Sequence, residues 1–260
     1  NIHSNTGTTI DSICAMDADV VLIQEIHKDS LSWLAEQAGY GYYVFGGFTD
    51  NYGIAIISRW PILTHHIISA PFTDPPRVLL CAEVLFLLAD GTDARSLRIA
   101  NTHLTPMSED VRFKQMHYMM TQVQQSQFGV PDFLGGDFNS ITRSDYTPQQ
   151  LQQLPADRAQ NPIVIDALIR DYGFIDCWKQ VGGICENGDI NQSSIEPVSE
   201  ETSKFTAHDT MRIDYIFCHN QICSSAAVSK RGFWIEPVQQ RHLIDSSSDH
   251  YPVVLDFIIH

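Results

Sequence analysis

The chain has 260 residues, of which 43% are hydrophobic and 18% are charged, and its formal net charge is −15. This size and composition predict one globular domain over residues 1–260 with a sizeable core, rather than two small domains. A chain with this much negative charge lacks the basic surface that is expected of a tight nucleic-acid binder. A phosphate substrate is still compatible with the charge of the chain if a divalent cation neutralises the site. The longest apolar run, residues 78–89, is too short to span a bilayer and contains Glu83, so we expect no transmembrane segment.

Runs of apolar and β-branched residues predict strands along the whole chain. In chain order, the predicted strands cover residues 18–26, 52–58, 78–88, 95–104, 131–138, 212–219 and 252–259. The third and fourth of these runs bracket a polar turn that contains Asp-Gly, which predicts a β-hairpin.

Three segments between the strands carry helix signals. Residues 29–39 end on a glycine, residues 108–127 start with a Ser N-cap followed by acids, and residues 161–173 combine an Asn N-cap, a Pro at the first helical position and a C-terminal glycine. A methionine stripe in the second helix is interpreted as core packing. Residues 147–160 and 186–203 are polar and predict exposed loops.

The order of these elements predicts the fold class. Strands precede helices early in the chain and form hairpins later, a pattern that favours two mixed, mostly antiparallel sheets packed face to face with helices outside. We therefore predict an α+β fold in the form of a four-layer α/β/β/α sandwich.

The six cysteines indicate neither a metal site nor a disulfide framework, because none lies in a C-x-x-C pattern. Cys14 and Cys81 lie in apolar stretches and are expected in the core. Cys177 and Cys185 could form a disulfide in an oxidising compartment, but we favour free thiols because the core is large enough without one. We favour a soluble, cytoplasmic protein over a secreted one. The sequence begins at Asn1 without a methionine, and we expect a preceding segment that it does not include.

Acidic, amide and histidine side chains recur where the predicted strands end. In chain order they are Glu25, Asn101, His103, Asp137, Asn139, Asp214, Asp249 and His250, and Asn1 opens the chain. Each of them alone is typical of an ordinary structural residue, and the Gly-Gly-Asp-Phe-Asn stretch at 135–139 alone is typical of a turn. Strand ends in layered α/β folds also hold side chains rigidly at the mouth of a cleft. The recurrence along the whole chain favours one polar site.

Seven short motifs contain most of these residues. They are NIH (1–3), IQE (23–25), GIAIISRWP (53–61), NTHL (101–104), GDFN (136–139), RIDYIF (212–217) and SDHYPV (248–253). Together they resemble the endonuclease/exonuclease/phosphatase superfamily, which has the fold of DNase I. Each motif is weak alone, but the set covers the chain nearly end to end in family order. The resemblance implies the same four-layer sandwich and a metal-dependent hydrolase of phosphoester bonds.

The resemblance also implies a cation site for Mg²⁺, with Mn²⁺ as a substitute. Glu25 is the implied principal ligand, with Asn1 beside it and Asp249 as a further ligand. This set suits the ion, because Mg²⁺ prefers one or two carboxylates and leaves other positions to water and substrate oxygens.

The catalytic roles that the resemblance implies centre on Asp137, which would orient or deprotonate the attacking water. Asn139 would donate its amide to the phosphate or position that water. His250 would hydrogen-bond a non-bridging phosphate oxygen as a cation or serve as an acid–base group, and Asp214 would hold its ring and raise its pKa. His103 matches a second histidine that contacts the phosphate. Such donors suit a transition state that gains negative charge.

Two further residues are expected to bind the substrate. Arg77 stands where DNase I-like members often carry an arginine that faces the substrate, and arginine pairs bidentately with phosphate. An ordinary loop arginine is an equally good interpretation of Arg77. Asn101, in the same motif as His103, is the second expected substrate contact.

The chain departs from the motifs of individual branches of the superfamily, and these departures narrow the range of substrates that we expect. The chain lacks the aromatic and arginine residues that follow G-D-x-N in phosphoinositide 5-phosphatases, and HLTP replaces the Pro-Asn dipeptide of AP endonucleases. We therefore predict a phosphodiesterase that acts on nucleic acids or nucleotides. A phospholipid-headgroup phosphodiesterase of the sphingomyelinase type, or a phosphatase, is the alternative, and a non-catalytic binding scaffold is the second alternative. The expected partner is the phosphoester substrate, and we expect a monomer.

Overall fold

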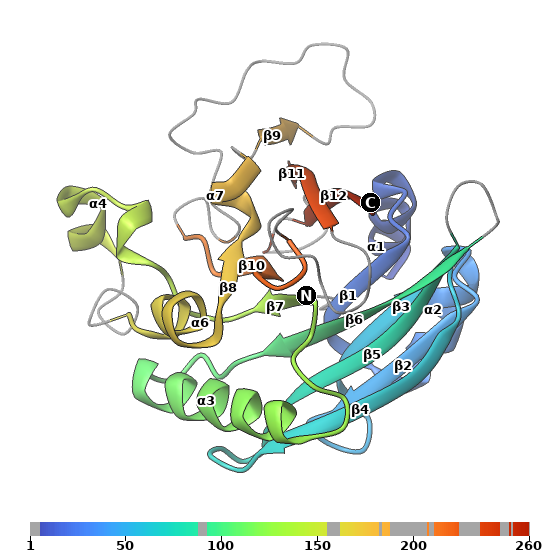
Figure 1. Cartoon of the computed structure of the whole chain (residues 1–260), viewed down its shortest axis with the longest axis horizontal. Helices are drawn as coiled ribbons and strands as arrows, with labels where there is room; N and C mark the ends of the chain where they lie inside the picture. The colour runs from blue at the N-terminus through green and yellow to red at the C-terminus, as the bar shows by residue number, and fades with distance from the viewer. Residues whose placement is uncertain are drawn as a thin grey trace.

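The computed structural model describes residues 6–87, 93–154, 162–181, 184–187, 207, 211–223, 235–244, 250 and 252–259. Within these ranges the chain forms one six-stranded sheet and two three-stranded sheets, with helices on the outer faces (Figure 1). The predicted residues Asn1 and Asp249 lie outside the described residues.

The six-stranded sheet carries most of the motifs. Its strands, in spatial order, are β4 (Ile62–Ala70), β5 (Arg77–Leu87), β6 (Ala94–His103), β7 (Phe133–Asp137), β10 (Asp214–His219) and β8 (Phe174–Asp176). Every neighbouring pair is antiparallel except β6 and β7, which run parallel. The hairpin predicted from the apolar runs around the Asp-Gly turn is confirmed as β5–β6, although the turn itself lies outside the described residues.

Two three-stranded sheets form the second β-layer. One has the order β1 (Val20–His27), β3 (Tyr52–Ser58) and β2 (Tyr42–Gly47), and the other has the order β12 (Val253–Ile259), β11 (Ile235–Ile244) and β9 (Ile184–Asn187). Both contribute side chains to the apolar core that covers one face of the six-stranded sheet. On β12, for example, the ring of Phe257 packs 4.9 Å from that of Phe133 and 6.3 Å from that of Phe86, between ring centroids.

The alternation of strand side chains builds the layers. On β5, Leu80 and Ala82 face the second β-layer, whereas Leu79 and Cys81 face the helical side. A strand that is buried on both faces reads as one apolar run, which is why every residue of 78–87 except Glu83 is hydrophobic.

Helices cover both outer faces. The helices are α1 (Thr6–Met16), α2 (Lys28–Gln37), α3 (Glu109–Gln125), α4 (Pro148–Gln153), α6 (Val164–Tyr172) and α7 (Cys177–Val181), and a 3₁₀ turn covers Arg143–Asp145. α2 packs on the sheet that contains β1, and α3 and α6 pack on the six-stranded sheet (Figure 1). The four-layer sandwich predicted from the element order is therefore confirmed. The methionines of α3 lie in the core, as the stripe predicted.

The start of α6 differs from its prediction. The helix begins at Val164, and its N-cap residue, Ile163, makes no side-chain cap. Instead the buried carboxylate of Glu109, from α3, accepts hydrogen bonds from the backbone N–H groups of Ile163 and Val164 at 2.8 and 2.9 Å. A distant carboxylate thus satisfies the helix end, which local sequence signals cannot reveal. Gly173 ends the helix with φ 73, as predicted.

Two other expectations were wrong. The predicted loop 147–160 contains α4, which has a complete capping box between Thr147 and Gln150. Cys14 is exposed rather than part of the core, because it lies on the outer face of α1. Cys177 is a buried free thiol, whereas Cys218 and Cys223 form a disulfide that their spacing did not indicate.

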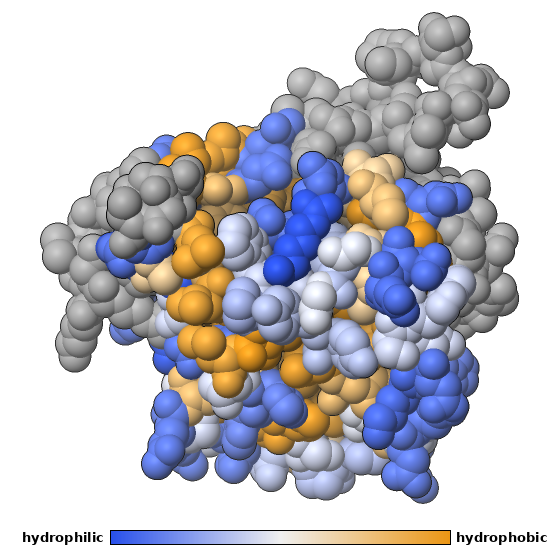
Figure 2. Space-filling view, turned by 90° about the vertical axis from the view of Figure 1, so that its right-hand side faces the viewer, coloured by the Kyte–Doolittle hydropathy of each residue, from blue (hydrophilic) through white to orange (hydrophobic). Residues whose placement is uncertain are grey.

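The outer face that carries α1 and α2 mixes side chains of both kinds. Figure 2 turns the right-hand side of Figure 1 to the viewer and shows apolar residues in a band among hydrophilic ones. In the described part of the chain, no helix combines the length and apolar character needed to cross a membrane.

Gly136 is a position where the fold requires glycine. Its φ is 130, and a Cβ placed there would overlap the carbonyl oxygen of Thr102 on β6. We expect Gly136→Ala to lower the free energy of unfolding by about 2–4 kcal/mol, from backbone strain and overpacking. Denaturant unfolding measures this. Gly41→Ala is the control, since a Cβ at Gly41 meets nothing within 4 Å, and equal losses in both variants would contradict the explanation.

Arg212 is a buried cation held by two acids. Its guanidinium lies 2.9 Å from Asp145 and also pairs with Asp176, and it stacks 4.3 Å from the ring centroid of Tyr215. Arg212→Met removes the positive charge from this buried cluster, so we expect a loss of about 3–5 kcal/mol in unfolding free energy. Arg170→Met, which removes an exposed arginine paired with its neighbour Asp171, is expected to change little. Similar small effects of both substitutions in chemical denaturation would refute the structural role of the cluster.

Candidate active site

One edge of the six-stranded sheet brings four of the predicted residues into a row. In the strand register, His103 on β6 pairs with Asp137 on β7, and Asp137 pairs with Asp214 on β10. Arg77 opens β5 on the other side of β6, two residues before Leu79, which pairs with Thr102. Neighbouring strands lie about 5 Å apart, so the register alone places these side chains within reach of one another.

Asp137 is at the centre of the row and is 2% exposed. Its Oδ1 accepts a hydrogen bond of 2.8 Å from the backbone N–H of Asn139. Its Oδ2 lies 3.4 Å from Nε2 of His103 and 3.9 Å from Nε2 of His250. One carboxylate oxygen is therefore used to hold the turn, and the other faces two imidazoles.

Asn139 adopts φ 52, the left-handed conformation that asparagine tolerates better than most residues. Its side-chain Nδ2 donates a hydrogen bond of 3.0 Å to the carbonyl of Leu104, the residue after β6. The turn interpretation of the Asp-Phe-Asn stretch is thus confirmed, and the turn sets the direction of Asp137, whose role in a site stays a prediction.

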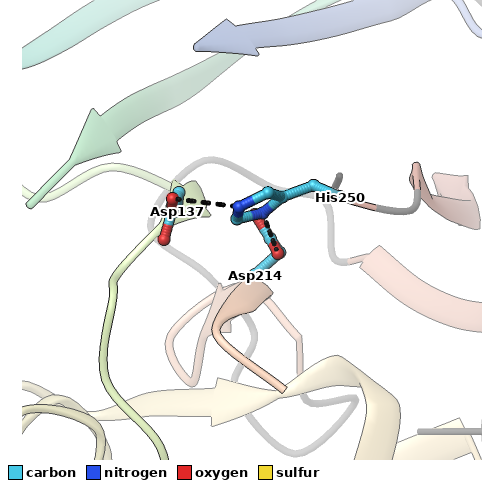
Figure 3. Close-up of side chains that lie close together, drawn as sticks. All are labelled: Asp137, Asp214 and His250. Carbon is cyan, nitrogen blue, oxygen red and sulfur yellow. Dashed lines mark hydrogen bonds and ion pairs between the residues drawn. The ribbon is translucent and has the colours of Figure 1, made fainter. Parts of the chain in front are cut away.

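His250 lies between two carboxylates, as Figure 3 shows. Its Nδ1 is 2.8 Å from Oδ2 of Asp214, and its Nε2 points toward Asp137. Burial alone would lower the pKa of His250, but the Asp214 carboxylate, through its charge and hydrogen bond, raises that pKa to about 9. His250 is therefore a cation at neutral pH. An apolar cavity of about 230 Å³ adjoins the pair, and its low polarity strengthens such an interaction.

His103 has the opposite character. Burial lowers its pKa to about 4 despite the nearby Asp137 charge, so the ring is neutral at physiological pH. Phe48 packs edge-to-face against it, with 5.9 Å between ring centroids. The two histidines beside Asp137 thus differ in charge, because only His250 has its own carboxylate partner.

Arg77 is the first residue of β5 rather than a loop residue, and its contact with substrate stays a prediction. Its guanidinium stacks 4.7 Å from the ring centroid of Phe48. Burial lowers the pKa of Arg77, and the charges of Asp137 and Glu25 oppose that shift. A half-buried guanidinium next to two carboxylates remains charged and can pair with a phosphate.

Glu25 reaches the site from the second β-layer. It has φ 60 and lies at a register shift of β1 between Ile23 and Ile26. Burial, followed by the charge of Glu25, raises the pKa of Tyr52 to about 12. The charges of Asp137 and Glu25 both act on Arg77.

The donor chemistry of this neighbourhood fits a hard divalent cation. Asp137, Asp214 and His250 each offer one ligand atom within 4.8 Å of the others. Because His250 is cationic and bonded to Asp214, it suits proton handling better than metal ligation. Carboxylate oxygens such as those of Glu25 suit Mg²⁺ or Mn²⁺. The other two expected ligands, Asn1 and Asp249, lie outside the described residues.

Asn101 differs from its predicted role as a substrate contact. It is fully buried, and its amide bonds to the carbonyls of Ile23 and Ala55 and to the side chain of Gln24. Asn101 therefore joins the two β-layers rather than facing a ligand.

No sequence pattern indicated two aromatic residues beside the predicted site. Phe48, in the turn before β3, contacts both Arg77 and His103, and the pKa of Tyr52, the first residue of β3, is raised by burial and by the charge of Glu25. Their role depends on how the two β-layers meet, which no local pattern encodes.

Comparison with known proteins agrees with this geometry. The family model described as "Endonuclease/Exonuclease/phosphatase family" matches residues 1–250. No curated protein matches the sequence. Among solved structures, an endonuclease/exonuclease/phosphatase from Bacteroides vulgatus has a TM-score of 0.68 at 13% identity, with 98% of this chain and 90% of that chain covered.

Two further similar structures are of proteins with a named ligand or activity. One is D. rerio TDP2 complexed with single strand DNA product, with a TM-score of 0.59, 19% identity and coverage of 98% and 93% of the two chains. The other is a mannosyl-6-phosphatase from Bacteroides thetaiotaomicron VPI-5482, with a TM-score of 0.61, 13% identity and coverage of 98% and 90%. At such identities the likeness shows the fold.

Asp214→Asn tests the charge of His250. The variant keeps the shape of the side chain but removes its negative charge, so the pKa of His250 should fall from about 9 to its ordinary value of 6.5 or below. An NMR titration of the imidazole resonances measures this, with His250→Asn to assign the signal. A pKa that stays near 9 in Asp214→Asn would show that Asp214 is not the cause.

The same pair predicts how stability depends on pH. Because the folded-state pKa of His250 lies above 6.5, the pair's contribution is fully present below pH 6.5 and is lost as the pH rises through about 9. The difference in unfolding free energy between the wild type and Asp214→Asn should therefore shrink over this range. A difference that grows over the same range would contradict the assignment.

Proposed function

The chain belongs to the endonuclease/exonuclease/phosphatase family, and from this membership we propose that it is a divalent-metal-dependent phosphoesterase that hydrolyses phosphodiester bonds of nucleic acids or nucleotides. The observation that carries the proposal is the Asp137 carboxylate, which lies between a neutral His103 and a cationic His250. A carboxylate that accepts a proton beside a cation that donates a hydrogen bond is the arrangement that water attack on a phosphoester needs.

In the proposed mechanism Asp137 acts on the water. Its Oδ2 accepts a proton from the water molecule as the water oxygen bonds to phosphorus. The bond between phosphorus and the leaving-group oxygen breaks in the same reaction, and the departing oxygen takes up a proton from solvent. The fixed Oδ1, bonded to the Asn139 backbone, keeps the carboxylate from turning away. His103 lies 3.4 Å from Oδ2 and is neutral, so it adds no positive charge beside the carboxylate that accepts the proton.

The cations of the site act on the phosphate. The Nε2–H of His250 donates a hydrogen bond to a non-bridging oxygen, and Asp214 keeps the ring protonated while this happens. The guanidinium of Arg77, held against Phe48, pairs with a second oxygen. Both interactions strengthen as negative charge develops on the phosphoryl oxygens, and they therefore favour the transition state over the bound substrate.

The proposed cofactor is Mg²⁺, with Mn²⁺ as a substitute. Glu25 would hold it, with Asn1 and Asp249 as the other expected ligands, and when bound it would neutralise phosphate charge near a protein of net charge −15. The carboxylate-rich donor set supports this choice over a softer metal.

Two properties support a nucleic-acid or nucleotide diester. Arg77 and His250 supply two cationic donors, enough to match the single negative charge of a diester without a larger basic patch. The structural neighbour D. rerio TDP2 is titled as a complex with single strand DNA product. The similar structure of a mannosyl-6-phosphatase supports a phosphate monoester as the alternative substrate.

Asp137→Asn is expected to lower kcat for bis-p-nitrophenyl phosphate by at least about 10²-fold, the usual scale for loss of a general base. Steady-state hydrolysis with Mg²⁺, and again with EDTA, measures the effect. Asp110→Asn on the exposed side of α3 is the matched control and should keep full activity. Full activity of Asp137→Asn would remove Asp137 from the mechanism.

A substrate panel then separates the candidate functions. Single-stranded DNA, RNA, a nucleotide diester, sphingomyelin, a phosphoinositide and p-nitrophenyl phosphate are compared at equal concentration with Mg²⁺. Preference for the nucleic acids or the nucleotide supports the proposal. Preference for a lipid or for the monoester favours the alternatives, and no hydrolysis of any substrate with Mg²⁺ or Mn²⁺ favours the binding scaffold.

A further inference from the structure

The backbone at Glu25 is held in an unusual conformation. Its φ of 60 lies in the left-handed region, which costs a non-glycine residue energy, and the pairing of β1 with β3 shifts register at the same point. Such a conformation persists only where the surroundings hold it. The question is which side chains do so.

The side chain of Asn101 fixes the backbone before Glu25 through hydrogen bonds. Its Nδ2 donates hydrogen bonds of 2.9 Å to the carbonyls of Ile23 and Ala55, which face each other across β1 and β3. Its Oδ1 accepts a hydrogen bond of 2.8 Å from Nε2 of Gln24, the residue before Glu25. The side-chain amide of Asn101 is thus hydrogen-bonded to both residues that precede Glu25, in a region that is closed to solvent.

Asn101 is itself fixed relative to the catalytic strand. It lies two residues before His103 on β6 and pairs with Gly135, two residues before Asp137 on β7. A Cβ on Gly136 would lie 2.9 Å from Oδ1 of Asn101, so the amide packs directly beside the backbone of β7. One side chain therefore links the strand of Glu25 to the strands of His103 and Asp137.

Tyr52 fixes β1 on the far side of the register shift. It pairs with His27 in the register of β1 and β3, and its ring is packed between Phe48 and His27, at 6.2 and 5.3 Å between ring centroids. The backbone of β1 is thus held on both sides of Glu25.

We propose that Asn101 is a positioning residue that sets the Glu25 carboxylate for a divalent cation. The inference rests on the proposed function, because it takes Glu25 as a ligand. Asn101, which was predicted to contact the substrate, acts in this proposal through Glu25. Outer partners of metal ligands commonly change metal affinity by about 10–100-fold when removed.

The test measures Mn²⁺ affinity directly, by electron paramagnetic resonance of free Mn²⁺, without substrate. Asn101→Leu keeps the number and branching of the side-chain heavy atoms but removes all three hydrogen bonds, and Mn²⁺ should bind about 10–100-fold more weakly. Thr102→Val is the matched control: Thr102 is the buried neighbour on β6 and donates 3.1 Å to the carbonyl of Val78, away from Glu25. Its Mn²⁺ affinity should equal that of the wild type.

A double-mutant cycle with Glu25→Gln separates positioning from general loosening. In the Glu25→Gln background, Asn101→Leu should cause no further loss of Mn²⁺ affinity, because the ligand that it positions is already gone. Equal weakening by Asn101→Leu and Thr102→Val, or an unchanged affinity in folded Asn101→Leu, would overturn the inference.

A milder variant decides the matter if Asn101→Leu does not fold. Gln24→Met removes the hydrogen bonds from Nε2 of Gln24 to Oδ1 of Asn101 and to the carbonyl of Leu22, and it leaves the Asn101 amide in place. Weaker Mn²⁺ binding in Gln24→Met supports the inference, and wild-type affinity overturns it. A wild-type protein that binds no Mn²⁺ overturns the proposed cofactor and this inference together, whereas wild-type binding that Glu25→Gln abolishes leaves the proposed cofactor standing whatever Asn101 does.

Discussion

The register between β6, β7 and β10 is the constraint on which the site depends. It places His103, Asp137 and Asp214 side by side across three strands, and a shift of one residue in either pairing would turn a member of the row to the opposite face. The close approach of Gly136 to Thr102 fixes that register, since no other residue fits there. The geometry of the row is thus a consequence of strand pairing, and among the described residues Asn139 and His250 join it from outside these strands.

Charge within the row follows from burial and partners. Four ionisable side chains meet in a nearly dry space, which is costly unless opposite charges pair. Asp214 and His250 form such a pair, while His103 avoids the cost by staying neutral. The Oδ1 of Asp137 accepts a backbone hydrogen bond, and its Oδ2 faces the two imidazoles.

Much of this could be predicted from the sequence, because strands that are buried on both faces read as apolar runs and polar residues at their ends stand out. Asp137, Asp214 and His250 were found in that way. What could not be predicted depends on contacts between layers: the amide of Asn101 turns inward to β1 and β3, Tyr52 and Phe48 enter from another hairpin, and Glu109 caps a helix from 54 residues away. That residues 1–260 form one domain stays a prediction.

The central claim is that carboxylates from the two β-layers meet around one divalent cation. A crystal soaked with Mn²⁺ and measured for anomalous scattering tests it most directly. The account predicts one strong peak beside the Glu25 carboxylate, on the side that faces Asp137 and Arg77. A peak elsewhere on the protein, or Glu25 and Asp137 turned toward separate regions with no ion between them, would contradict it.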